Sequence, residues 1–429
     1  MGRIAGRFGR VEPRRRARAF VLGLLADLPR KNCWSIAEHA GDPTPGGMQH
    51  LLGRACWDAD GVRDDLRDYL TGHLGDPGAV LVVDETGDVK KGAATAGVQR
   101  QYTGTAGRTE NAQVAVYLAY VSPAGHALMD RELYLPRSWT TDPGRCRAAG
   151  IPEGTGFATK PALARRMLAR TLDARVPAAW VAGDEVYGTD PQLRGDLEER
   201  ETGYVLAVAC RHRFTTGLRT SRADELARRL PTSAWQRYSA GPGAKGHRYY
   251  DWAWVTTDPG QPGHRWLLIR RNRRTRKLAY YRCYSPRHVS LATLVKVAGL
   301  RWPIEENFQA SKALAGLDEH QVRTWTSWYR WVTLAMLALA FLTVTAATEH
   351  TSRPPPPGQT PLTRNEIARL LTMITRPARD PRHLLHWSAW RRRHQHRAKT
   401  SHYQRPSPQT MKVTIYRWSI NTTARFCDL

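Results

Sequence analysis

The sequence contains few cysteines, and none of them are closely paired. Its six cysteines are spread over 429 residues without a C-x-x-C pair. Structural zinc modules need closely spaced thiolates, and small secreted domains need a dense disulfide framework. The spacing therefore argues against both classes and fits a protein of the reducing cytoplasm.

Acidic residues are scarce relative to basic ones. The chain has 38 Asp and Glu against 65 Lys and Arg, a formal net charge of +27 at pH 7. This excess is larger than solubility requires. Each phosphate that a basic side chain neutralises releases counterions, so such an excess favours a polyanionic partner such as nucleic acid. An anionic membrane surface would attract the same charge.

Long apolar runs are also rare. The segment WVTLAMLALAFLTVTAA (331–347) carries no charge, but its length is at the short limit for a spanning helix. It also contains three threonines and lacks a flanking positive cluster. We therefore expect a buried core helix and no membrane partner, with a spanning helix as the alternative.

Changes in residue pattern divide the chain into five parts. Residues 1–75 show apolar residues at three-to-four spacing and are expected to form a helical N-terminal region. Residues 76–210 alternate β-branched runs with amphipathic segments, which predicts an α/β core with a mixed sheet. Residues 211–290 hold aromatic-rich β stretches, expected to form an inserted β subdomain, and helical periodicity resumes over 291–350. Residues 351–429 combine a proline-rich linker with a basic C-terminal region.

Two aspartates follow apolar strand patterns. Asp84 lies in VLVVDETG and Asp184 in VAGDEVYG. The carboxyl ends of strands are where α/β proteins place functional groups, and the preceding apolar run fixes the backbone that carries them. An aspartate that starts a turn is the structural alternative. Two such acids in a strongly basic chain favour a functional pair.

A third acidic candidate lies in RWPIEENFQASK (301–312). Pro303 suits the first turn of a helix, and glutamates there are favoured by the helix dipole. At about 100° per residue, Glu305 and Lys312 lie within roughly 20° of one face, whereas Glu306 points about 100° away from Glu305. The face shared with Lys312 therefore nominates Glu305.

Carboxylates from three distant segments suit a magnesium-dependent reaction on phosphates. Mg²⁺ prefers oxygen ligands and keeps positions open for water or phosphate. Two such ions about 4 Å apart activate a water or a 3′-hydroxyl and stabilise the leaving oxygen of an in-line transfer. Arginine and lysine would then clamp the phosphates.

These motifs resemble those of bacterial insertion-sequence transposases of the DDE type, which have a ribonuclease-H-like core with a β-rich insertion. The resemblance covers roughly residues 5–400 and includes VVDETGDVKKG, AGDEVYG and RWPIEENFQASK. It implies that Asp84, Asp184 and Glu305 are catalytic and bind two Mg²⁺ ions, which Mn²⁺ can replace. It also implies DNA cleavage at the ends of the element, followed by strand transfer into a target.

One branch of these enzymes carries the signature Y-x2-R-x3-E-x6-K. Arg301, Glu305 and Lys312 match it, whereas Ala298 occupies the tyrosine position. By this resemblance, Arg301 and Lys312 would contact phosphates near the cut. The other candidate DNA contacts are Trp302, Lys90 and Lys91.

The resemblance also suggests roles for other parts of the chain. In relatives an aromatic residue of the insertion receives a flipped base, for which Trp252, Trp254 and Trp266 are candidates, although aromatic strand residues more often serve packing. Basic runs at 270–277 and 390–397 are candidate phosphate contacts, although such runs are usually solvated. Residues beyond about 406 are expected to be poorly ordered.

The family further implies a homodimer during synapsis, an N-terminal region that recognises terminal inverted repeats, and a bacterial cytoplasmic location. A competing hypothesis is a non-catalytic DNA-binding regulator derived from a transposase. The three acids kept in register with Arg301 and Lys312 favour the enzyme.

Overall fold

The computed structural model describes residues 1–243, 246–353, 355–375 and 380–404. The C-terminal stretch beyond 406, for which poor order was expected, lies outside these residues.

The N-terminal region is helical, as its apolar spacing predicted. Its elements are η1 (Ala5–Arg7), α1 (Val11–Leu25), α2 (Cys33–His39), α3 (Gly46–Gly53) and α4 (Ala59–Leu74). The side chain of Asn32 accepts hydrogen bonds from the first turn of α2, and Asp58 does the same for α4. Apolar faces of α1, α3 and α4 pack against the long helix α13 (Trp325–Ser352).

A mixed sheet forms the core. Its strands are β1 (Val80–Val89), β2 (Gln99–Thr103), β3 (Arg108–Ser122), β4 (Gly125–Leu133), β5 (Trp180–Gly183) and β6 (Gly203–Val208). β1 is antiparallel to β3, which also pairs with β4, and it is parallel to β5, which is parallel to β6. The spatial order β4-β3-β1-β5-β6 is that of a ribonuclease-H-like core, so the predicted fold class is confirmed.

Helices cover both faces of this sheet. They are α5 (Arg137–Thr140), α6 (Pro143–Ala148), α7 (Lys160–Asp173), α8 (Glu185–Gly188), α9 (Pro191–Glu199), α11 (Leu291–Gly299) and α12 (Pro303–Ala315). Successive residues of β1 face opposite sides. Thr86 points toward α12, where it contacts Lys312, and Glu85 points toward α7, where it contacts Lys160. The two helices therefore lie on opposite faces of β1.

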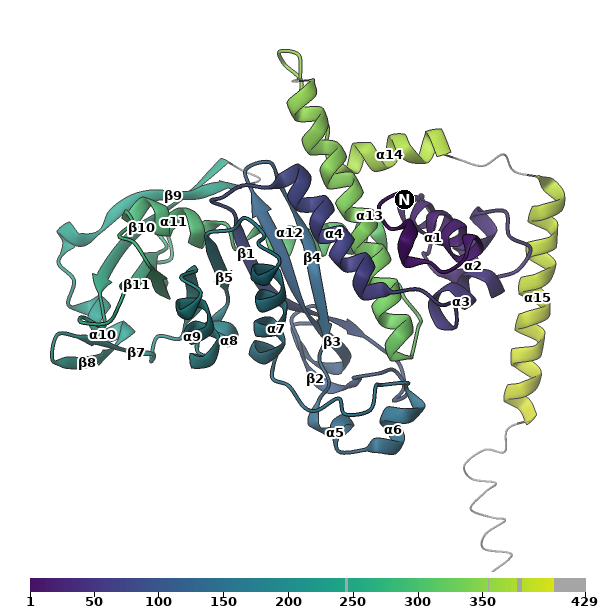
Figure 1. Ribbon diagram of the computed structural model, residues 1–429, viewed down its shortest axis with the longest axis horizontal. Helices are drawn as coiled ribbons and strands as arrows, with labels where there is room; N and C mark the ends of the chain where they lie inside the picture. Colours follow the sequence, from purple (N-terminus) through teal and green to yellow (C-terminus); the bar gives the residue numbers. More distant parts are fainter. Residues whose placement is uncertain (244–245, 354, 376–379, 405–429) are drawn as a thin grey trace, which may run out of the picture.

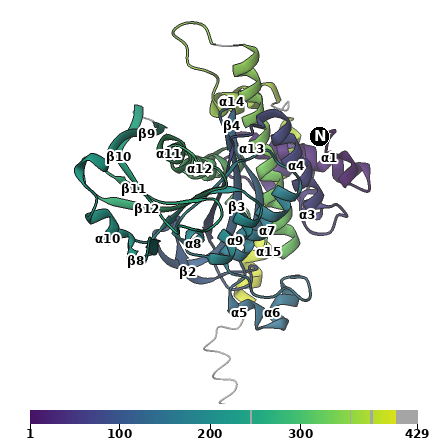
Figure 2. The same ribbon diagram turned by 60° about the vertical axis from the view of Figure 1, so that its left-hand side comes forward.

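The aromatic-rich stretches form strands that extend the core sheet. The elements of this part are β7 (Arg213–Thr216), β8 (Arg219–Arg222), α10 (Ala223–Arg228), η2 (Thr232–Ala234), β9 (Gln236–Gly243), β10 (Gly246–Thr256), β11 (His264–Arg271) and β12 (Leu278–Ser285). β12 pairs antiparallel with β6, so β9–β12 continue the same sheet (Figures 1 and 2). Among the described residues, this sheet has ten strands and β7–β8 form a separate pair.

The last helices are α13, α14 (Arg364–Thr375) and α15 (Pro381–Gln404). α13 is long and apolar enough to cross a membrane, but 78% of its most apolar window is buried inside the protein. It packs against α1, α4, α12 and β4. The expectation of a buried core helix over 331–347 is confirmed.

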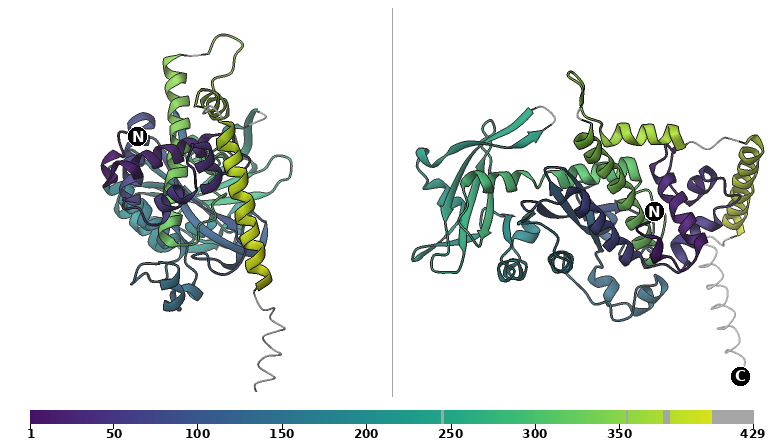
Figure 3. Two further views of the ribbon diagram at one scale, coloured as in Figure 1. Left: turned by 90° about the vertical axis from the view of Figure 1, so that its right-hand side faces the viewer. Right: turned by 45° about the horizontal axis from the view of Figure 1, so that its top comes forward.

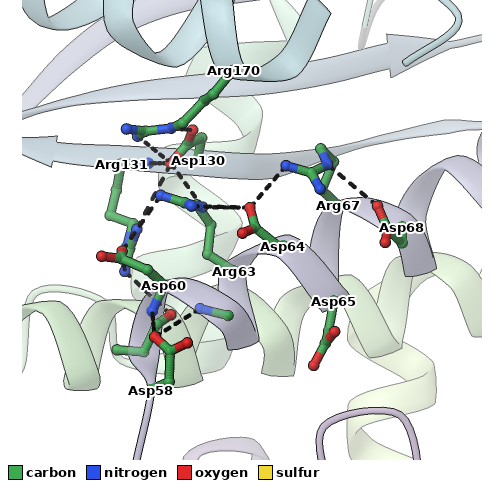
Figure 4. Close-up of polar contacts among 12 residues, drawn as sticks. Asp58, Asp60, Arg63, Asp64, Asp65, Arg67, Asp68, Asp130, Arg131 and Arg170 are labelled. Carbon is green, nitrogen blue, oxygen red and sulfur yellow. Dashed lines mark hydrogen bonds and ion pairs between the residues drawn. The ribbon is translucent and has the colours of Figure 1, made fainter. Parts of the chain in front are cut away.

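A buried ionic network joins the N-terminal region to the core (Figure 4). The guanidinium of Arg170 on α7 donates two hydrogen bonds to Asp130 on β4, at 2.5 and 2.7 Å. Arg131 on β4 contacts Asp60 of α4 at 2.9 Å, and Arg63 of α4 lies 3.9 Å from Asp130. Asp130 and Arg131 are almost fully buried, so α4 is fixed to the sheet by charges that water cannot screen.

Candidate active site

The register of the parallel strands brings two aspartates together. Val83 of β1 is the partner of Gly183, the last residue of β5. Asp84 and Asp184 are the next residues of these neighbouring chains, at the carboxyl end of β5. Adjacent strands lie about 4.8 Å apart, so the two acids predicted from separate motifs lie side by side.

Asp84 is held in a mostly buried position. Its side chain is 15% exposed, and its Oδ2 accepts a hydrogen bond from Arg301 Nη1 at 3.0 Å. Burial raises the pKa of Asp84 to about 7, against the attraction of Arg301, and the charge of Asp184 raises it further. The carboxylate is therefore short of positive charge even with Arg301 beside it.

Asp184 begins the short helix α8. Its Oδ1 accepts a hydrogen bond from the backbone N–H of Val186 at 2.8 Å, which fixes the side chain at the end of β5. Burial raises the pKa of Asp184, and the neighbouring charge of Glu85 acts in the same direction. Like Asp84, it would gain from a nearby cation.

The two adjacent glutamates of α12 have different surroundings. Oε1 of Glu305 lies 3.6 Å from Arg301 Nη2, and its side chain is 44% exposed. Glu306 turns away, and its Oε2 lies 3.4 Å from Nε2 of His126. The hydrogen bond with His126 lowers the pKa of Glu306. Glu305 therefore faces the aspartates, whereas Glu306 contacts a different part of the core.

Arg301 links the three acids. It is hydrogen-bonded to Asp84 and ion-paired with Glu305, and it attracts the charge of Asp184 as well. In the described part of the chain, no three His, Cys, Asp or Glu side chains are grouped closely enough to hold a metal ion as they stand. The donors nonetheless fit a hard divalent cation, because all are carboxylate oxygens gathered around one positive charge.

Lys312 lies further along the same face of α12. Its Nζ donates hydrogen bonds to Thr86 Oγ1 at 3.1 Å and to Thr105 Oγ1 at 3.3 Å. Arg301 therefore meets β1 at Asp84, and Lys312 meets it two residues later. The helical spacing that related Glu305 to Lys312 in the sequence thus corresponds to one face of α12 turned toward β1.

The other predicted DNA contacts differ in accessibility. Lys90 points inward and donates a hydrogen bond to the carbonyl oxygen of His320 at 3.1 Å, close to Asp88. Lys91 is exposed. Trp302, beside Arg301, is 48% exposed. Lys91 and Trp302 are therefore accessible to a ligand, whereas Lys90 is occupied within the protein.

A second network behind the aspartates was not anticipated from the sequence. Glu85 accepts hydrogen bonds from Lys160 Nζ at 2.6 Å and from the hydroxyl of Tyr187 at 2.5 Å. Glu85 follows Asp84, and Tyr187 lies three residues after Asp184. Their contact ties the two aspartate-bearing segments together on the far face of the sheet. The motifs contain both residues, but only the fold reveals that they meet.

The tryptophans considered for base flipping are packing residues in large part. Trp252 is fully buried, and Trp266 is 3% exposed. Trp254 stacks on Trp266 with ring centroids 5.7 Å apart. Two of the three candidates are therefore inaccessible to a base in this structure.

Comparisons with known proteins agree with the arrangement of the site. Residues 3–241, more than half of the chain, match the family described as DDE superfamily endonuclease. This range includes Asp84 and Asp184. A probable transposase of the insertion sequence element IS701 from Microchaete diplosiphon is 30% identical over 192 residues. That match covers 44% of this chain and 48% of the relative, so the chain spans about half the length of the curated relative.

A solved structure of the piggyBac transposase synaptic complex with hairpin DNA is 12% identical to this chain, with a TM-score of 0.41. The alignment covers 85% of this chain and 71% of the other. The family match, extending over more than half of the sequence, confirms the resemblance found in the motifs: the protein belongs to the DDE superfamily of endonucleases and is related to insertion-sequence transposases.

Proposed function

We propose that the protein is a cut-and-paste DNA transposase, which cleaves DNA at the ends of an insertion sequence and joins them to a target. The observation that carries this proposal is the convergence of Asp84, Asp184 and Glu305 around Arg301 at the carboxyl edge of the sheet. Such an oxygen-rich site beside a basic helix face suits phosphoryl transfer.

In this proposal the three acids hold two Mg²⁺ ions, or Mn²⁺ in their place. When bound, these ions activate the attacking water or 3′-hydroxyl and stabilise the leaving oxygen. Arg301 exchanges its contact with Asp84 for the phosphate at the cut, to which a guanidinium donates two hydrogen bonds. Lys312 holds a neighbouring phosphate, and its threonine contacts fix its position until DNA binds.

The remaining expectations are part of the same proposal. Trp302, Lys90 and Lys91 stay candidate DNA contacts, with Trp302 and Lys91 the more accessible. We retain the homodimer at synapsis and a bacterial cytoplasmic location, on the nucleoid when bound to DNA.

The proposed division of the chain also follows the sequence. It comprises an N-terminal DNA-binding region (1–75), a core in two parts (76–210 and 291–350), an insertion (211–290) and a C-terminal region (351–429).

Cleavage of a labelled duplex that carries the end of the element tests the proposal. Asp84→Asn, Asp184→Asn and Glu305→Gln should each lower the cutting rate in Mg²⁺ by more than about 100-fold, because even residues that only orient metal ligands contribute about 10–100-fold. Binding to the duplex should remain within about threefold of the wild type.

Glu306→Gln is the matched control, since it removes an adjacent carboxylate of the same helix and should retain cutting. Loss of cutting in Glu306→Gln, with retention in Glu305→Gln, would exchange the roles of the two glutamates. Wild-type protein that binds the end but never nicks it would favour a non-catalytic DNA-binding regulator.

A further inference from the structure

Helix α15 is anchored to the N-terminal region through its first half. The side chain of Trp387 is fully buried, and its Nε1 donates a hydrogen bond to the carbonyl oxygen of Asp42 at 2.9 Å. Nε2 of His386 lies 2.8 Å from the carbonyl oxygen of Pro43. Trp34 of α2 packs against Trp387 with ring centroids 6.4 Å apart. These contacts fix the direction of the helix relative to α1–α3 (Figures 1 and 3).

The second half of α15 has no comparable packing. Every residue from 391 to 401 is exposed, and no acidic residue occurs between 381 and 401. Its basic residues are Arg391, Arg392, Arg393, Arg397 and Lys399. Arg391 pairs with Glu38 at 2.6 Å, and among the described residues the other four form no ion pair.

Such a helix is poorly supported by its own chain. Arg393 and Arg397 are four residues apart, a spacing at which like charges destabilise a helix. Neither acidic partners nor buried apolar contacts offset this repulsion between 391 and 401. Helices without tertiary packing are marginal in water, so this segment needs a partner that supplies negative charge along its length.

The loop that anchors α15 also anchors the basic face of α1. Asp42 is ion-paired with Arg16 at 3.6 Å and receives the hydrogen bond of Trp387. Next to Arg16, α1 exposes further arginines at positions 14, 15 and 18. Two arginine-rich helices are therefore fixed to one short loop, which gives the N-terminal end of the molecule a positive surface built from both ends of the chain.

We propose that residues 391–401 of α15 lie along double-stranded DNA and hold its phosphates through Arg392, Arg393, Arg397 and Lys399. The inference rests on the proposed function, since it specifies how a transposase would hold the duplex away from the cut. The exposed segment is about 16 Å long, and a major groove about 12 Å wide admits a helix. The duplex supplies the continuous negative charge that the segment lacks.

A salt titration of duplex binding tests this proposal in EDTA, where cutting is suppressed. The full chain carrying Arg392→Gln, Arg393→Gln and Arg397→Gln is compared with the wild type on a duplex of the element's end and on a scrambled duplex. Each lost phosphate contact lowers the salt slope by about 0.9, so the wild type should lose roughly 40-fold more affinity than the variant between 50 and 200 mM salt. The difference should appear on both duplexes.

The matched control removes the same charge from the β7–β8 hairpin through Arg211→Gln, Arg213→Gln and Arg219→Gln. These arginines are exposed and lie at the opposite end of the long axis from α15 (Figure 1). The control should keep a slope within about one of the wild type. An equal fall in both variants would show that net charge alone is responsible and would overturn the proposal.

The outcomes separate this inference from the proposed enzyme. An α15 variant that binds both duplexes with the wild-type slope would refute the role of α15, whether or not it cuts. Retained DNA binding with lost adsorption to phosphatidylserine vesicles would assign the segment to membranes instead. Wild-type protein with the expected slope difference but without cutting in Mg²⁺ would support α15 as a DNA contact and refute the transposase.

Discussion

Replacing Asp130 by asparagine should lower the free energy of unfolding by about 3–5 kcal/mol, because it removes one partner of a buried ion pair. The Asp130 side chain is 3% exposed and accepts two hydrogen bonds from Arg170. Arg63 and Arg131 lie within 3.9 Å of the same carboxylate. An asparagine would leave three arginines around a neutral group that water cannot reach.

The expected change in melting temperature follows from the size of the chain. Unfolding entropy is about 2.1 cal/mol/K per residue, or roughly 0.9 kcal/mol/K for this protein, so the loss corresponds to about 3–6 °C. Thermal unfolding followed by circular dichroism at pH 7 measures it.

Asp173→Asn is the control, since Asp173 pairs with Arg200 at 2.6 Å but is 62% exposed. An exposed pair contributes about 0–1 kcal/mol, so this variant should melt within about 1 °C of the wild type. If Asp130→Asn melts no lower than Asp173→Asn, the network does not hold α4 to the sheet, and the argument from burial is refuted.

Three further predictions concern the site. The pKa of Asp84 is raised from 3.8 to about 7, so its ionisation opposes folding as the pH rises through this window; in EDTA, Asp84→Asn should therefore be more favourable to stability at pH 8 than at pH 4, by up to about 4 kcal/mol. Equal effects at the two pH values in thermal unfolding would contradict this. Adding 10 mM Mg²⁺ should raise the melting temperature of the wild type more than that of Asp184→Asn, and equal shifts would count against the metal site. Lys312→Met should lower the salt slope of DNA binding by about 1, whereas Lys90→Met should leave the slope unchanged and lower stability by about 1–3 kcal/mol, since its hydrogen-bond partner is left buried. Measured slopes that are the same for the two lysine variants would contradict their different placement.

The sequence identified the elements of the site but not the contacts between them. Asp84 and Asp184 could be nominated because an apolar strand precedes each, yet their adjacency depends on the pairing of Val83 with Gly183 across a hundred residues. Helical geometry alone separated Glu305 from Glu306. The partner of Glu306, His126, could not be inferred, since it lies on a strand 180 residues earlier.

Side-chain direction was the least predictable property. Lys90 and Lys91 are equivalent in the sequence, but Lys90 turns inward to His320 because Asp88 and the end of β1 place it beside a buried partner. The aromatic strands of the insertion were recognised as β structure. Their pairing with β6 buried Trp252 and Trp266, which no local pattern could distinguish from exposed binding residues.

The position of α13 in the sequence affects when the N-terminal region completes its fold. Helices α1, α3 and α4 bury their apolar faces against a helix that begins at Trp325, about 250 residues after α4 ends. Ribosomes add about 5–20 residues per second, so a nascent chain waits roughly 13–50 s between making these helices and making the surface that covers them. The helices proposed to grip DNA are therefore synthesised first and completed late, when nearly all of the catalytic site has already left the ribosome.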